Sequence, residues 1–99
     1  MKPQLSKIKT YIGFAVRSRQ VIYGVDDILK HNFKGLVLMS NALAESSANK
    51  LKNHISYAGG QVLSFEPEDF AELFGDKNIK AAAIKDNNLA VAIKKNMTN

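Results

Sequence analysis

The sequence predicts an α/β fold, a three-layer α/β/α sandwich with a central mixed sheet of mostly four strands. Segments of helical periodicity alternate with short apolar runs along the 99 residues. Strict alternation of this kind implies crossover connections and a sheet with helices on both faces. Two of the runs, Leu36–Met39 and Ala81–Ile84, are apolar without interruption, as is typical of strands covered on both sides. We expect both strands to be buried, in one domain spanning residues 1–99.

The first third of the chain contains two predicted helices and a strand. Residues 4–18 carry apolar side chains at helical spacing, which predicts an amphipathic helix. Val21–Tyr23 is expected to be a short strand. Asp26 and Asp27 then favour a helix start, since carboxylates stabilise a helix N-terminus. This second helix is expected to run to about His31.

The remaining helices are predicted from their boundary residues. Serine and asparagine cap helix starts, proline fits the first helical position, and glycine follows helix ends. The expected boundaries are Ser46 or Ser47 and Gly59-Gly60 for the third helix, Pro67 and Gly75 for the fourth, and Asn87 or Asn88 for the start of the last. Val62–Phe65 is expected to form the strand between the third and fourth helices.

Composition excludes several classes of protein. The chain is 45% hydrophobic and 23% charged, as in folded domains. It has no cysteine, which excludes a disulfide framework and a thiolate metal site. No apolar run approaches membrane-spanning length, and the first residues, MKPQLSKIK, lack the apolar core of a signal peptide. We expect a cytoplasmic protein that does not bind a membrane.

Basic charge is concentrated at the two ends of the sequence. The net charge is +5. Residues 1–34 hold seven lysines and arginines against two acids, residues 35–75 hold two against five, and residues 76–99 hold five against two. If the fold brings the ends together, one face is basic and the opposite face is not, as in a phosphate-binding surface. Composition leaves open the alternative that the charge only maintains solubility.

Residues suited to catalysis are few and dispersed. His31 and His54 are the only histidines and lack a nearby acidic cluster, so we expect ordinary helix-end or surface residues. Asp26 and Asp27 are adjacent, and neighbours on a helix point in different directions. No serine lies in a nucleophile-elbow motif. Core or boundary positions, rather than an exposed stacking platform, are expected for the aromatic residues Tyr11, Phe14, Tyr23 and Tyr57. We expect no enzyme activity, no metal and no cofactor.

The segment Ile12–Lys30 carries the clearest functional pattern. A helix end with Arg17 and Arg19 leads into a short strand, Gly24 ends the strand, and a new helix begins. Glycine lets the backbone approach a ligand closely, and the first N–H groups of a helix have no internal partner. With basic residues beside it, this turn suggests a seat for a nucleic-acid backbone. The alternative is an ordinary strand-to-helix turn.

The segment Gly24–Lys30, Gly-Val-Asp-Asp-Ile-Leu-Lys, also resembles a family signature. In the kink-turn RNA-binding ribosomal proteins, a glycine and a variable residue precede Asn, Glu, two further residues and Lys. That superfamily includes the archaeal large-subunit protein seven-Ae, the thirty-e protein and small bacterial relatives. Segments Ile12–Gln20, Leu36–Ala42 and Phe70–Gly75 resemble the bacterial members in the same order. The resemblance implies an α/β/α fold that binds kinked helix–internal-loop–helix RNA.

The resemblance further implies contacts to guanine edges of tandem sheared G·A pairs. Gly24 matches the turn, Asp26 the family's Asn, Asp27 its Glu and Lys30 its Lys. Lys30 keeps a cationic donor suited to guanine O6, and Asp27 keeps an acceptor for a guanine N–H. Asp26 instead replaces an amide that donates with a carboxylate that only accepts, and it adds negative charge where phosphates pass.

A second contact loop, Gly75–Lys80, is implied by the same resemblance. The expected RNA-binding residues are Arg17, Arg19, Gly24, Val25, Asp26, Asp27, Lys30, Lys77, Ile79 and Lys80. The five basic residues among them are expected to share one face. We expect a monomer that binds ribosomal RNA or another kink-turn RNA in a ribosome- or translation-associated role. The alternative is a protein-interaction module on the same fold that has lost RNA binding.

Overall fold

Helices and strands alternate along the chain in the computed structural model, which describes residues 4–31, 35–75 and 78–97. The elements are α1 (Leu5–Arg17), β1 (Val21–Tyr23), α2 (Val25–Leu29), β2 (Leu36–Ser40), α3 (Glu45–Tyr57), β3 (Gln61–Phe65), α4 (Pro67–Phe74), β4 (Ala81–Ile84) and α5 (Asn87–Lys95). The predicted order of elements is confirmed.

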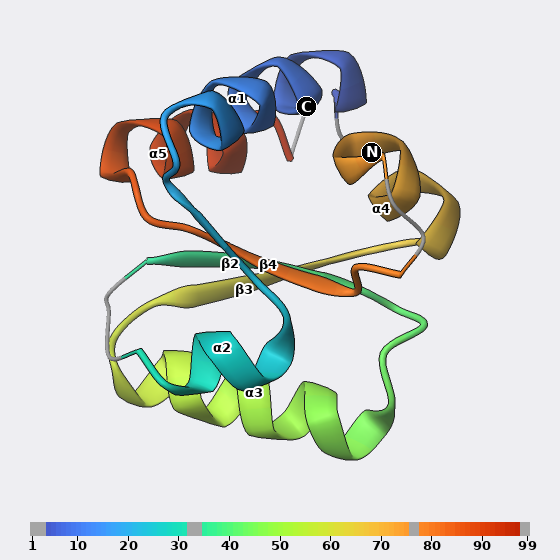
Figure 1. Ribbon diagram of the computed structural model, residues 1–99, viewed down its shortest axis with the longest axis vertical. Coiled ribbons are helices and arrows are strands. Elements are labelled where there is room, and N and C mark those ends of the chain that lie inside the picture. The colour runs from blue at the N-terminus through green and yellow to red at the C-terminus, as the bar shows by residue number, and fades with distance from the viewer. Residues whose placement is uncertain (1–3, 32–34, 76–77, 98–99) are drawn as a thin grey trace.

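The four strands form one mixed sheet in the order β1-β4-β2-β3. β4 lies antiparallel to both β1 and β2, whereas β2 and β3 are parallel and are joined through α3. Helices α1, α4 and α5 cover one face of the sheet, and α2 and α3 cover the other (Figure 1). The three-layer α/β/α sandwich is therefore confirmed.

The two central strands supply both halves of the core. In β2, Leu36 and Leu38 point into the core under α1, α4 and α5, while Val37 and Met39 point into the core under α2 and α3. All residues of β2 and β4 are buried. An uninterrupted apolar run is what a strand needs when its side chains meet a helix layer on either side, so the prediction of two buried central strands is confirmed.

Small side chains in β4 fit the position of the short helix α2. Ala81 and Ala83 face the core under α2 and α3, where the buried Ile28 of α2 packs among them. Because alanine projects so little from the sheet, a helix of five residues can bury its isoleucine close to β4. This packing fixes α2 alongside the edge strand β1.

Two predicted helix caps are wrong. α3 begins at Glu45, before Ser46 and Ser47, and the preceding Ala44 provides no side-chain cap. The cap of α5 is Asp86, whose Oδ1 accepts a hydrogen bond of 3.0 Å from the Leu89 N–H. Asp86 directly precedes Asn87 and Asn88, and aspartate caps as well as asparagine. Helix boundaries at Pro67 and Gly75 are as predicted.

The two ends of the described chain lie together, as the charge pattern supposes. The Gln4 N–H donates to the Asn96 carbonyl at 2.9 Å, so α1 and α5 are neighbours. The acidic residues of α4, however, lie in the same layer as these basic ends (Figure 1). The expectation of one basic face opposite a less basic face is therefore wrong, because acidic and basic residues share this helix layer. Among the described residues, no helix is long and apolar enough to cross a membrane.

Candidate nucleic-acid interface

The first turn of α2 is joined to the start of β4. Gly24 has φ +88°, a conformation that side chains with a Cβ rarely adopt. Its N–H donates to the Ala81 carbonyl at 2.9 Å, which ends the β1–β4 pairing. Glycine thus lets the chain turn from the sheet edge directly into α2.

The loop before β4 lies beside this turn. The Lys80 carbonyl accepts a hydrogen bond of 2.9 Å from the Ser40 N–H at the end of β2. Ile79 packs half-buried against the core under α1, α4 and α5, and Lys80 is exposed. Two segments that are far apart in sequence, the Gly24 turn and the loop at Ile79–Lys80, therefore meet at one end of the sheet.

The charged side chains of α2 are exposed and partly paired with each other. Lys30 Nζ lies 3.8 Å from Asp27 Oδ1, with 74% and 64% of the two side chains exposed. Asp26 is also exposed, and no side chain caps the start of α2. Val25 packs half-buried against the α2–α3 core. An exposed ion pair contributes about 0–1 kcal/mol, so both partners remain available to a ligand.

A pocket adjoins this end of the sheet. It has a volume of about 230 Å³ and lies between the end of β2, the start of α4 and the loop before β4. Its lining residues are Ser40, Ala42, Pro67, Glu68, Phe70, Ala71, Ile79 and Lys80. The lining is mainly apolar, with Lys80 and Glu68 as its charged members. Of these residues, sequence analysis identified only Ile79 and Lys80, because α4 and β2 approach the loop only in the folded chain.

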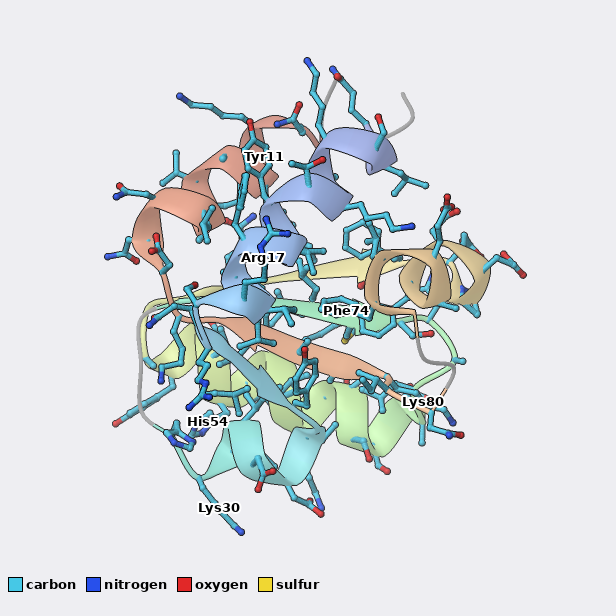
Figure 2. The ribbon with its side chains drawn as sticks, turned by 45° about the horizontal axis from the view of Figure 1, so that its top comes forward. Tyr11, Arg17, Lys30, His54, Phe74 and Lys80 are labelled. Carbon is cyan, nitrogen blue, oxygen red and sulfur yellow. The ribbon has the colours of Figure 1, made fainter. Side chains whose placement is uncertain are left out.

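The predicted basic residues do not form a single cluster. α1 ends, β1 begins and α2 ends at one end of the sheet, whereas the loop before β4 lies at the other end (Figure 1). Arg17, Arg19 and Lys30 belong to segments at one end of the sheet, and Lys80 belongs to the loop at the other. Figure 2 shows in addition that Arg17 lies on the α1 side of the sheet and Lys30 on the α2 side. The Arg17 guanidinium lies 4.9 Å from the centre of the Phe14 ring. Lys77 lies outside the described residues.

Both histidines act as helix-end residues, as predicted. The His31 Nδ1 lies 2.8 Å from the Asp27 carbonyl oxygen, and the His54 Nε2 lies 2.7 Å from the His31 carbonyl oxygen. In each case the ring N–H is the donor. The second bond ties the last turn of α3 to the end of α2. No group of three possible metal ligands occurs among the described residues.

The aromatic residues are more exposed than sequence spacing predicts. Tyr57 is 96% exposed at the end of α3, so its predicted core or boundary position is wrong. Phe14 and Tyr23 are exposed as well, by 46% and 38%, although Tyr23 packs edge-on against Phe74 with ring centres 6.4 Å apart. The burial of Ile55 fixes the outward direction of Tyr57 two positions later, because positions i and i+2 of a helix point apart.

Comparison with known proteins supports the fold alone. No protein-family model and no curated protein matches the sequence. The solved structure of a protein with unknown function from Bacillus halodurans is similar, with a TM-score of 0.79 and 18% sequence identity. The match covers 90% of this chain and 94% of that chain.

Proposed function

We propose that this protein binds structured RNA of the kink-turn class and acts in a ribosome- or translation-associated complex. The observation that carries the proposal is the meeting of the Gly24 turn with the loop at Ile79–Lys80, through the 2.9 Å bond from Gly24 to Ala81. These are the two segments in which the family resemblance implies RNA contacts. The α/β/α fold agrees with the same resemblance.

The exposed charges of α2 suit a guanine edge. Lys30 presents an ammonium donor for guanine O6, and Asp27 presents an acceptor beside it, 3.8 Å away. Donor and acceptor at this separation can serve two neighbouring base edges. Asp26 adds a negative charge at the start of α2, which opposes the approach of phosphates. We therefore expect the affinity to be below what an amide at this position allows.

The pocket beside Lys80 supports the same proposal. Proteins that recognise RNA by sequence take up unstacked bases from loops and bulges, which they hold against apolar or aromatic surfaces. The pocket offers Pro67, Ala71 and Ile79 for such a base, and Lys80 at its rim carries a positive charge for a phosphate. An internal loop supplies both groups at once.

Two substitutions in α2 test the proposal. Lys30→Ala is expected to weaken binding to a kink-turn RNA by about 1–3 kcal/mol, the scale of a lost base-edge contact. Asp26→Asn is expected to strengthen binding, because the amide restores a donor and removes a charge. Both side chains are exposed, so neither variant should unfold. Titrations against a kink-turn duplex and a straight duplex of equal length, at two salt concentrations, measure both effects.

A matched control is Lys52→Ala on α3. His54 faces α2 through its bond to the His31 carbonyl, and Lys52, two positions earlier and exposed, points away from that side. Lys52→Ala should leave the preference for the kinked duplex intact. Equal wild-type affinity for the kinked and straight duplexes, or equal losses in Lys30→Ala and Lys52→Ala, would contradict the proposal.

The second candidate is a protein-interaction module on the same fold. The observation that favours it is the pair of exposed carboxylates, Asp26 and Asp27, at the uncapped start of α2. RNA affinity falls steeply with salt because RNA binding releases counterions from phosphates, whereas the affinity of an apolar protein interface changes little with salt. RNA binding that is weak at low salt and independent of the kink therefore favours this second function.

A further inference from the structure

At the end of the sheet where β1 begins, Lys85 adds a cation that is not among the expected RNA contacts. β1 contains three residues and spans about 10 Å. α2 begins at the far end of β1 and runs back in the opposite direction for five residues, or about 8 Å. The two lengths are similar, so the end of α2 lies at the same end of the sheet as the start of β1, in the layer of α2 and α3 (Figure 1).

Lys85 lies at this same end. The Lys85 N–H donates to the Gln20 carbonyl at 2.8 Å, and Gln20 directly follows Arg19 in the chain. Side chains alternate along a strand, and Ala83 faces the core under α2 and α3. Lys85, two positions later, therefore continues the row that faces the α2 side of the sheet.

The positive charge at this end has little compensation. Arg19 and Lys85 are exposed, and neither forms an ion pair with another described residue. The carboxylate next to Lys85, Asp86, accepts the capping hydrogen bond from Leu89. Asp27 lies beside Lys30. The histidines on the neighbouring helix ends, His31 and His54, have one ring nitrogen each engaged with a backbone carbonyl.

We propose that Arg19 and Lys85 form a second phosphate-contact surface, the β1-start surface, for one arm of the bound RNA. The inference rests on the proposed function. Arg19 before β1 and Lys85 after β4 lie at the same end of the sheet as the end of α2, which carries Lys30, while Lys80 lies at the opposite end of β1. A kinked RNA carries two helical arms, and the two ends of β1 provide a basic contact for each. Lys85 joins the interface only because β4 pairs with β1.

Neutralising the two cations tests this surface. Lys85→Gln and Arg19→Gln are each expected to weaken kink-turn binding several-fold and to lower the slope of log affinity against log salt by about one. Arg19→Gln keeps a side chain of similar shape at its backbone position. Lys52→Gln on α3 removes the same charge elsewhere and is expected to change the affinity little. Thermal melts of all variants should coincide with that of the wild type.

Shortening the RNA identifies the arm. We expect the effect of Lys85→Gln to disappear when one of the two arms is cut back and to persist when the other is cut back. Equal effects of Lys85→Gln and Lys52→Gln on the full RNA would overturn the β1-start surface and leave the proposed function standing. If the wild type does not prefer the kink, the proposed function fails. The comparison of the same two variants on a straight duplex then decides whether the surface contacts RNA at all.

Discussion

Arg19 has an unusual backbone conformation for a residue with a side chain. Its φ is +59°, in the turn where its N–H donates to the Val16 carbonyl at 3.1 Å. The left-handed conformation costs about 1–2 kcal/mol for residues with a Cβ. The turn from α1 into β1 therefore carries a local cost, at a residue whose charge we assign to RNA binding.

Glycine at this position is expected to stabilise the free protein. We expect Arg19→Gly to raise the free energy of unfolding by about 0.5–1 kcal/mol, since glycine adopts positive φ without steric cost but gains entropy in the unfolded chain. Arg19→Lys keeps both the Cβ and the charge and should leave stability unchanged. Urea denaturation followed by circular dichroism measures both. An unfolding midpoint for Arg19→Gly at or below that of the wild type would show that the turn does not strain the arginine.

Single residues also mark the limit of sequence reasoning. The capping residue of α5 was mistaken because three consecutive residues, Asp86, Asn87 and Asn88, are all good caps. Which of the three residues becomes the cap depends on their backbone angles, and these angles cannot be derived from the local sequence. Lys85 was missed because its neighbour Gln20, which precedes β1, is far away in the sequence. The signature at Gly24–Lys30 was visible because it is local.

At the scale of elements, α1 carries a glycine that its own packing does not require. Gly13 lies within the helix, and a Cβ placed there meets nothing within 4 Å. Gly60, after the end of α3, is the opposite case. A Cβ there would collide with the Gly35 carbonyl oxygen and lie 2.8 Å from Ile55 Cγ2. Position 13 therefore has room for a larger side chain, whereas position 60 does not.

Alanine at these two positions should have opposite effects. Gly13→Ala is expected to stabilise the protein by about 1 kcal/mol, the difference in helix propensity. Gly60→Ala is expected to destabilise it, because backbone atoms must move to admit the methyl group. Thermal unfolding of both variants against the wild type measures the two shifts. A lower melting temperature for Gly13→Ala would mean that α1 approaches another surface at this point.

At the scale of the whole molecule, the alternation of elements predicted the layers but not the strand order. The sequence identified both buried strands because a run such as Leu36–Met39 must face apolar layers on either side. It did not show that β4 lies between β1 and β2, since pairing partners depend on contacts across the chain. Because β4 runs antiparallel to β1, Lys80 before β4 lies near the last residues of β1, whereas Arg19 lies before its first.

Hydrogen exchange of backbone amides should follow the strand order. We expect the slowest exchange in Val37–Met39 and Ala82–Ile84, which are paired on both sides and buried. At the two ends of β1, Gly24 donates to the Ala81 carbonyl and Gln20 accepts from the Lys85 N–H. In this register Ile22 and Ala83 form a hydrogen-bonded pair, and the N–H groups of Val21 and Tyr23 point away from β4. Ile22 should therefore exchange more slowly than its two neighbours. Nuclear magnetic resonance after transfer into deuterated water resolves these amides, and equal rates across β1 would argue against its edge position.

The central position of β4 has a consequence for how the chain folds as it is synthesised. β1 is among the first segments to be made, and β4, the strand with which it pairs, comes after β3. The parallel unit of β2, α3 and β3 can assemble before that, with contacts between consecutive segments. Val21 can pair only after its partner Ile84 has been synthesised. Because such long-range pairing is slow, the edge strand β1 stays unpaired until β4 emerges, although α1 can already pack against α4. The surface at both ends of β1 is completed when β4 pairs with it.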